Sequence, residues 1–138
     1  MKRAFLDANV LFSAAYMEKA GLLRLWRLPG VQLLTSDYAV KEASANLHES
    51  VQRDRLAKLL ETVEITPYTS LLPALPVDVM LPEKDVPILQ AAIDAHATVL
   101  LTGDVTHFGR YFRKTIGGVH ILPPSDFLLD FSQQRFVL

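Results

Sequence analysis

Four carboxylates stand at positions where separate structural elements could bring them together. Asp7 and Asp104 each follow a short apolar run, Asp85 stands at the first turn of a segment with helical spacing, and Glu42 lies one to two turns into another. Clustered carboxylates repel one another and lose hydration, and a hard divalent cation with oxygen ligands relieves both costs. The pattern therefore favours a site for Mg²⁺ or Mn²⁺.

Each acid also has an ordinary structural explanation. Asp85 could be a helix N-cap, because Asp is favoured there and the helix dipole stabilises it. Glu42 could be a solvated helix residue, and Gly103-Asp104 is a common turn dipeptide. Asp7 is harder to explain in this way, because a carboxylate at the end of a buried strand needs a partner. It is the set of four that points to a metal site.

The elements that carry these acids alternate between strand and helix. Apolar runs predict strands at 4–6, 31–34, 63–65, 98–101 and 119–122. Apolar residues at helical spacing predict helices over 10–28, 38–47, 51–61, 84–93, 105–113 and 127–131. This alternation predicts an α/β fold in three layers, with a central parallel sheet of four to five strands and helices on both faces. Ligands bind such sheets beyond the carboxyl ends of the strands.

Composition sets wider limits. The length predicts one domain over residues 1–138, and 14 Lys plus Arg against 15 Asp plus Glu leave no overall basic charge for nucleic acid. The absence of cysteine excludes disulfides and thiolate zinc sites. No apolar run approaches the roughly 18 residues that span a bilayer, and Asp7 and Asn9 interrupt the only stretch that resembles a signal peptide. We expect a cytoplasmic protein that makes no membrane contact.

The sequence around the four acids resembles the PIN-domain family, and in particular its small prokaryotic members of the VapC toxin type. The segments that carry the resemblance are 5–11 (FLDANVL), 36–42 (SDYAVKE), 84–92 (KDVPILQAA) and 99–108 (VLLTGDVTHF). They follow one another in the family's order and cover nearly the whole chain. Two positions depart from the pattern: Ala8 stands where Thr or Ser is common, and His107 stands where many relatives have Asp.

The resemblance implies a metal-dependent endoribonuclease that hydrolyses RNA phosphodiester bonds with Mg²⁺ or Mn²⁺, and a candidate toxin of a type II toxin–antitoxin pair. The catalytic and metal-binding residues that it implies are Asp7, Glu42, Asp85 and Asp104. Asn9 and Thr102 would hold Asp7 and Asp104 in place. The implied partners are RNA, an antitoxin protein and a second copy of the chain. The apolar segments 10–28 and 51–61 offer a surface for this homodimer.

Three basic residues that follow Asp104 can be interpreted in two ways. His107, Arg110 and Arg113 could contact the RNA backbone, or they could form a solvated face of a short helix. Two other functions stay as alternatives. A phosphatase with Asp7 as nucleophile usually has a second Asp two residues later, where this chain has Asn9, and no Gly-rich phosphate loop follows. A catalytically silent binding module has no need of the four acids.

Overall fold

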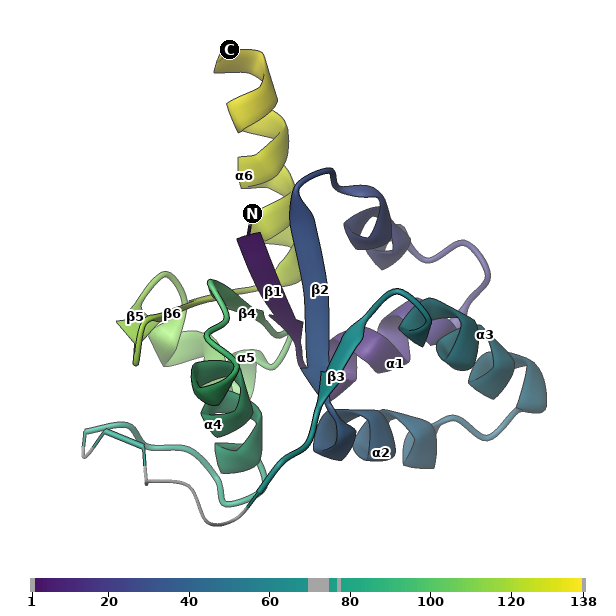
Figure 1. Cartoon of the computed structure of the whole chain (residues 1–138), viewed down its shortest axis with the longest axis horizontal. Coiled ribbons are helices and arrows are strands. Elements are labelled where there is room, and N and C mark those ends of the chain that lie inside the picture. The colour runs from purple at the N-terminus through teal and green to yellow at the C-terminus, as the bar shows by residue number, and fades with distance from the viewer. Residues whose placement is uncertain (1, 70–74, 77, 138) are drawn as a thin grey trace.

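A central sheet of six strands organises the chain, of which the computed structural model describes residues 2–69, 75–76 and 78–137 (Figure 1). The strands are β1 (Lys2–Leu6), β2 (Val31–Ser36), β3 (Glu64–Thr66), β4 (Val99–Leu101), β5 (Thr115–Ile116) and β6 (Val119–Leu122). They lie in the order β3-β2-β1-β4-β6-β5. The first five of these run parallel, and β5 pairs antiparallel with β6.

The prediction of four to five strands was wrong, because the hairpin of β5 and β6 adds a strand at the edge of the sheet. Gly117 and Gly118 both have positive φ, at 58° and 85°. Such backbone angles form the tight turns that join antiparallel strands, because their twist matches that of the strands. The chain therefore folds back at these two glycines, between β5 and β6. β5 has two residues, which are too few to show a strand pattern in the sequence.

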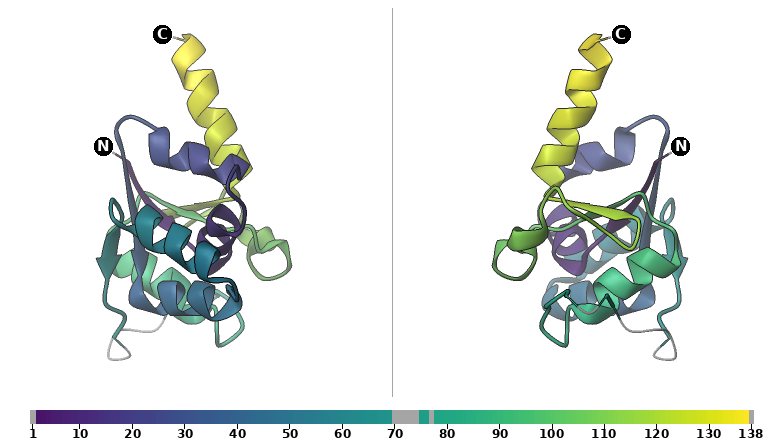
Figure 2. Two further views of the ribbon diagram at one scale, coloured as in Figure 1. Left: turned by 90° about the vertical axis from the view of Figure 1, so that its right-hand side faces the viewer. Right: turned by 90° about the vertical axis from the view of Figure 1, so that its left-hand side faces the viewer.

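Helices cover both faces of the sheet, which confirms the predicted three-layer α/β/α arrangement. The helices are α1 (Ala8–Tyr16), α2 (Asp37–Asn46), α3 (Ser50–Leu60), α4 (Val86–Asp94), α5 (Val105–Phe108) and α6 (Pro124–Val137), with 3₁₀ turns η1 (Gly21–Arg27) and η2 (Gly109–Tyr111). Views from opposite sides show α1 and α3 on one face and α4 on the other (Figure 2). The end of α6 extends away from the sheet. Among the described residues, no helix is long and apolar enough to cross a membrane.

The helix predicted over 10–28 is two shorter elements. α1 ends at Tyr16, and the chain passes through an extended residue, Met17, before η1 begins. The guanidinium of Arg55, on α3, donates to the carbonyl oxygens of Ala15 and Tyr16, both at 2.9 Å. These carbonyls are among those that a helix leaves unpaired at its C-terminus. A side chain 39 or more positions away thus supplies the cap, and local periodicity could not reveal it.

The connection of the strands opens a crevice at one edge of the sheet. From β1 the chain moves to β2 and β3 on one side, and then crosses to β4 on the other side of β1. Helices that leave β1 and β4 therefore lie on opposite faces, and the carboxyl ends of these two strands mark the switch in strand order. The last three residues of β1 and all of β4 are buried, as Phe5 and Leu100 illustrate with 0% exposure. The residues that follow them are consequently held on a rigid base.

Candidate metal centre and active site

A cleft of about 450 Å³ lies at this switch point, and all four predicted acids line it. We call it the acid cleft. Asp7 comes from the end of β1, Glu42 from α2, Asp85 from the start of α4, and Asp104 from the turn after β4. Four separate elements thus deliver one carboxylate each, as the sequence predicted. The other lining residues are Ala8, Asn9, Phe12, Ala43, Asn46 and Lys84.

Asp7 is a buried carboxylate with both oxygens hydrogen-bonded. Its Oδ1 accepts from the backbone N–H of Ala8 at 2.6 Å, and its Oδ2 accepts from the Thr102 hydroxyl at 2.8 Å and the Asn9 amide at 3.0 Å. Burial nevertheless raises the pKa of Asp7 to about 6, and the nearby charges of Asp85 and Glu42 add to that rise. The hydrogen bonds from Thr102 and Ala8 oppose it. The charge of Asp7 is therefore costly in the metal-free protein.

Asn9 and Thr102 tie the two loops of the switch point together. The Thr102 hydroxyl, besides donating to Asp7, accepts from the Asn9 amide at 3.2 Å and from the backbone N–H of Asp104 at 3.1 Å. The side-chain oxygen of Asn9 accepts from the backbone N–H of Gly103 at 2.8 Å. Asn9 is thus no N-cap, since Asp7 holds that position of α1. These contacts are what a supporting role for Asn9 and Thr102 requires.

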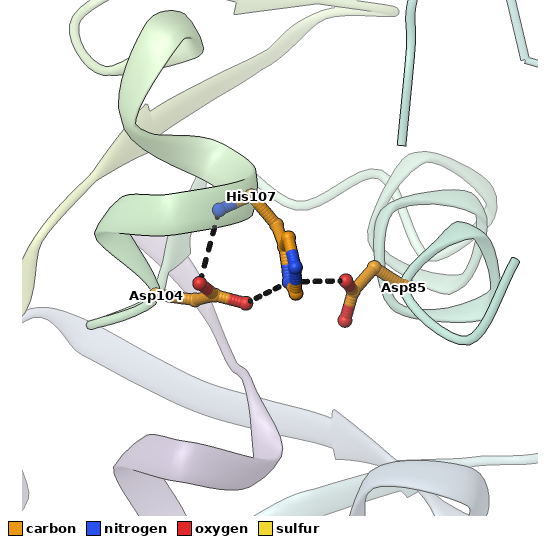
Figure 3. A group of neighbouring side chains, drawn as sticks. All are labelled: Asp85, Asp104 and His107. Carbon is orange, nitrogen blue, oxygen red and sulfur yellow. Dashed lines mark hydrogen bonds and ion pairs between the residues drawn. The ribbon is translucent and has the colours of Figure 1, made fainter. Parts of the chain in front are cut away.

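Asp85, Asp104 and His107 form a second group on the opposite side of the acid cleft (Figure 3). His107 Nδ1 lies 2.8 Å from Asp104 Oδ2 and 2.9 Å from Asp85 Oδ2. Asp104 Oδ1 accepts from the backbone N–H of His107 at 3.0 Å. A ring nitrogen carries at most one hydrogen, so Nδ1 can donate to only one of the two carboxylates.

Asp85 is left with an oxygen that no hydrogen bond satisfies. It occupies the N-cap position of α4, yet its side chain makes no capping hydrogen bond. Its Oδ2 is buried without a hydrogen-bond partner among the described residues. Burial raises the pKa of the Asp85 carboxyl, and the Asp104 charge acts in the same direction, against Lys84 and His107. An ordinary cap does not explain this orientation, because the carboxylate faces His107 instead of the helix N–H groups.

These residues fit a divalent cation. The ligand atoms offered by Asp85, Asp104 and His107 all lie within 4.8 Å of one another. The buried Asp85 Oδ2 makes no hydrogen bond among the described residues, and the ring nitrogen beside it, His107 Nδ1 at 2.9 Å, is shared with Asp104. Carboxylate oxygens are the ligands that Mg²⁺ and Mn²⁺ prefer. Burial is the main cause of the raised pKa of both Asp7 and Asp85, and a bound cation would offset both this cost and the added repulsion between the carboxylates.

Glu42 approaches the acid cleft from α2, where it is half-buried. Tyr38 stands one turn earlier on the same helix, and its hydroxyl donates to the backbone oxygen of Lys84 at 2.8 Å. Burial, together with the carboxylate of Glu42, raises the pKa of Tyr38 to about 12. Tyr38 therefore stays a hydrogen-bond donor and fixes α2 against the segment that leads to α4. The sequence analysis gave Tyr38 no role.

Comparison with known families decides what the chain is. The model of the PIN-domain family matches residues 3–106, three quarters of the chain and a span that contains all four acids of the cleft. The chain belongs to the PIN-domain family. The resemblance found in the sequence is thereby confirmed, and His107 lies just beyond the matched span of this PIN domain.

One solved structure supports the same fold for this PIN domain. A chain in the crystal structure of VapBC2 from Rickettsia felis, bound to a DNA fragment from their promoter, superposes with a TM-score of 0.65. The match covers 88% of this chain and 98% of that chain at 16% sequence identity. None of the curated proteins matches the chain significantly. At this identity the likeness shows the fold alone.

The three basic residues predicted near the PIN-domain cleft lie in different surroundings. His107 joins Asp85 and Asp104, as described above. Arg110 is exposed and lines a neighbouring hollow of about 480 Å³ together with His107. The guanidinium of Arg113 instead pairs with Asp126 at 3.4 Å and Asp130 at 3.3 Å, both on α6. Arg113 is absent from the lining of the acid cleft.

Several cleft residues were not predicted from the sequence, Lys84 and Phe12 among them. Lys84 brings a positive charge to the acid cleft, and Phe12 brings an aromatic ring. Lys84 directly precedes Asp85, and Phe12 lies three positions after Asn9, on the same side of α1. These spacings were a usable signal, because neighbours of a cleft residue at helical spacing face the same cleft.

Proposed function

We propose that this PIN-domain protein is a metal-dependent endoribonuclease that hydrolyses phosphodiester bonds of RNA in the acid cleft. One observation carries the proposal: Asp7, Glu42, Asp85 and Asp104 converge on a single cleft. One of their buried oxygens, Oδ2 of Asp85, makes no hydrogen bond within the described part of the chain, although His107 Nδ1 lies 2.9 Å away. Clustered, desolvated carboxylates are costly to keep in a fold that gains nothing from them.

Asp7, Asp85 and Asp104 would hold the cation, either Mg²⁺ or Mn²⁺. When bound, the cation lowers the pKa of water and offsets negative charge on a phosphodiester. Side chains of the protein would handle the water molecule and the phosphate. The half-buried carboxylate of Glu42 is placed to orient a water molecule and to take its proton. Lys84 would supply a positive charge to the phosphate in a cleft that four acids line.

Support for the ligands comes from Asn9 and Thr102, which hold Asp7 and the backbone of Asp104 in one hydrogen-bonded unit. Fixed ligands lose no orientational freedom when a cation binds. For the RNA strand, Arg110 is the exposed cation next to the cluster. Arg113 is assigned to the contact with α6, because Asp126 and Asp130 already share its charge.

The proposal extends to partners and location. The matched solved structure is of VapBC2 with promoter DNA, and we take from it the expectation of an antitoxin partner and a role as a toxin. We also propose a two-fold homodimer in the cytoplasm. Exposed apolar side chains at the end of α1 and the start of α3, namely Tyr16, Met17 and Val51, are available for its interface.

A phosphatase that uses Asp7 as nucleophile is disfavoured by the surroundings of that residue. Asp7 is only 4% exposed. Both of its oxygens are engaged by hydrogen bonds from Ala8, Asn9 and Thr102. An attacking oxygen must have a free lone pair directed at the phosphorus atom. The same hydrogen bonds suit a carboxylate that is held in a fixed position as a metal ligand.

The test is cleavage of single-stranded and stem-loop RNA by the purified protein, with Mn²⁺, with Mg²⁺ and with a chelator. We expect cleavage with metal and none with the chelator. Asp130→Asn is the matched control, since it removes a carboxylate that lies outside the acid cleft. Cleavage that persists in the chelator, or that fails in every metal, contradicts the proposal; RNA binding without cleavage would favour a silent binding module.

A further inference from the structure

We infer that His107 is a direct metal ligand, so that this chain has a mixed nitrogen and oxygen site that selects a first-row transition-metal dication, such as Mn²⁺, over Mg²⁺. The inference rests on the proposed function, because it concerns the cation of the same cleft. It goes further by naming a nitrogen ligand and a preference between the two ions.

The spacing of the three ligand atoms carries the inference. Nδ1 of His107 lies 2.8 Å from Oδ2 of Asp104 and 2.9 Å from Oδ2 of Asp85. Around an octahedral cation with ligands at about 2.1 Å, neighbouring ligand atoms are about 3 Å apart. The imidazole nitrogen is therefore already as far from each carboxylate oxygen as neighbouring ligands of one cation are, and all three ligand atoms lie within 4.8 Å of one another (Figure 3).

The charge balance of the group leads to the same conclusion. Two carboxylates face one ring nitrogen, and a single proton on Nδ1 can satisfy only one of them. Asp85, which is 8% exposed, keeps an Oδ2 atom without a hydrogen-bond partner. A cation in place of that proton would pair with Asp85, Asp104 and His107 at once. The Asp85 oxygen, which has no hydrogen bond among the described residues although Nδ1 lies 2.9 Å from it, would then gain a charged partner of its own.

The position of His107 is fixed by the element that carries it. α5 is a short helix, and the Asp104 side chain caps it by accepting from the backbone N–H of His107. Residues three apart on a helix face the same direction, which puts Asp104 and His107 side by side. The next residue, Phe108, is fully buried and anchors the helix. His107 itself stays 29% exposed, so a cation can reach it.

An imidazole ligand changes which ion the site prefers. Mg²⁺ takes oxygen ligands and gives up its water reluctantly. First-row transition dications accept imidazole nitrogen, with affinities that rise from Mn²⁺ towards Cu²⁺. Of the ions expected from the sequence, Mn²⁺ therefore gains from His107 and Mg²⁺ does not.

Pulsed electron paramagnetic resonance of bound Mn²⁺ tests the inference without any measurement of activity. We expect the wild-type protein to show the nuclear coupling of a directly bound imidazole ¹⁴N. This signal should change to the ¹⁵N pattern when the protein is made with ¹⁵N-histidine. His107→Asn should abolish the signal, and the matched control His48→Asn, at an exposed position outside the acid cleft, should keep it.

Titration with each ion gives a second readout. His107→Asn should weaken Mn²⁺ binding by roughly 10- to 100-fold and leave Mg²⁺ binding nearly unchanged, so the Mn²⁺ to Mg²⁺ preference falls by at least about tenfold. Mn²⁺ binding without histidine coupling in the labelled wild type overturns the inference and leaves the carboxylate site intact. Failure of the wild type to bind Mn²⁺ at millimolar concentration contradicts the proposed metal dependence as well.

Discussion

Asp7 and Asp85 are both buried acids of one cleft, but their surroundings differ. Asp7 accepts three hydrogen bonds, from Ala8, Asn9 and Thr102. Asp85 has an Oδ2 atom with no hydrogen bond, and a histidine nitrogen that it shares with Asp104. The Asp7 side of the cleft is thus complete without a cation, whereas the Asp85 side is not. Asp7 is therefore the proposed ligand that the fold already holds in place, and the cation supplies what the Asp85 side lacks.

A second pair of acids, outside the acid cleft, has its counter-charge within the fold. Asp126 and Asp130, on α6, share the guanidinium of Arg113. Arg is permanently charged and its fork of N–H groups matches carboxylates, so these two acids have a counter-charge within the fold. Of the described residues that line the acid cleft, Lys84 alone is basic, and His107 contacts Asp85 and Asp104 beside it. The cleft therefore has an excess of negative charge that an external cation can balance.

The largest expected effect concerns catalysis on both sides of the cleft. We expect Asp7→Asn and Asp104→Asn each to lower Mn²⁺-dependent RNA cleavage by at least about 100-fold, since each removes a charged ligand. Initial rates on a labelled RNA measure the loss, with Asp130→Asn as the control that keeps its rate. If Asp7→Asn retains activity while Asp104→Asn loses it, Asp7 has a structural role alone and the two sides differ more than we propose.

The second expected effect is stabilisation by the metal. Mn²⁺ at a hundredfold excess over its dissociation constant should raise the free energy of unfolding by about 2.7 kcal/mol, because it binds the folded cluster and hardly binds the unfolded chain. For a chain of this length that corresponds to a rise in melting temperature of roughly 5–15 °C. Asp85→Asn should reduce the rise, a result that a helix-cap role for Asp85 does not predict.

Thermal melts at several pH values complete this test. The stabilisation by Mn²⁺ should shrink as the pH falls towards about 4, where protons compete with the cation for the carboxylates. A melting curve that ignores millimolar Mn²⁺ at pH 7.5 would show that the four acids form no competent site. It would leave the unpaired oxygen of Asp85 unexplained.

The contrast between the two sides also bears on what the sequence could predict. Asp7 and Asp104 follow buried strands, and parallel strands bring their carboxyl ends to one edge, so their meeting followed from the pattern. The orientation of Asp85 did not, because the N-cap position is equally compatible with capping and with the contact to His107. The spacing from Asp104 to His107 could have joined these two residues, since both lie at the start of one helix.

Long-range contacts explain the other differences. The end of α1 depends on Arg55, which approaches from α3 to bond the last carbonyls. The ion pairs of Arg113 depend on where α6 lies. Neither contact can be predicted from neighbouring residues. The helical pattern over 10–28 does not indicate the contact with Arg55, and the position of Arg113 near an acidic motif does not indicate its ion pairs with α6. The sequence thus predicted the layers and the position of the cleft, but not how individual side chains are satisfied.

The third expected effect is a pH-dependent gain in stability when Asp7 loses its charge. The pKa of Asp7 is raised from 3.8 to about 6, so the folded state binds this proton more tightly than the unfolded state. Stability of the metal-free protein therefore falls as the pH rises through about 4 to 6, by about 3 kcal/mol for a rise of this size.

Asp7→Asn removes that cost at neutral pH. The introduced amide places an N–H₂ group near the Asn9 amide, which offsets part of the gain. We expect a net stabilisation of about 2 kcal/mol at pH 7.5 and none at pH 4. Urea unfolding in a chelator measures both values. Asp130→Asn is the comparison, because it breaks an exposed ion pair with Arg113 and should destabilise by less than about 1 kcal/mol. A destabilised Asp7→Asn protein at pH 7.5 would contradict the raised pKa.

The smallest expected effect isolates the hydrogen bond that completes the Asp7 side. Thr102 and Thr35 are both fully buried, and each follows or ends a strand at the carboxyl edge of the sheet. The Thr102 hydroxyl donates to the Asp7 carboxylate, whereas the Thr35 hydroxyl donates to the neutral carbonyl of Leu6 at 2.7 Å. Replacement of either Thr by Val keeps the shape of the side chain and should cost about 1 kcal/mol for the bond that the hydroxyl donates. Thr102→Val also removes the acceptor of the Asn9 amide and of the Asp104 N–H, a loss that does not depend on the charge of Asp7.

The two substitutions should differ in their response to pH. The bond from Thr102 lowers the pKa of Asp7, so Thr102→Val should raise that pKa above about 6. Its cost should therefore be larger at pH 7.5, where Asp7 is charged, than at pH 4, where Asp7 is protonated in the folded state. Thr35→Val should cost the same at both, because its partner does not titrate. Unfolding in urea at the two pH values, with the Asp7 carboxyl followed by ¹³C nuclear magnetic resonance, measures both quantities. Equal pH dependence in the two variants would mean that the Thr102 hydroxyl does not stabilise the Asp7 charge, and that the two sides of the cleft are less different than their contacts indicate.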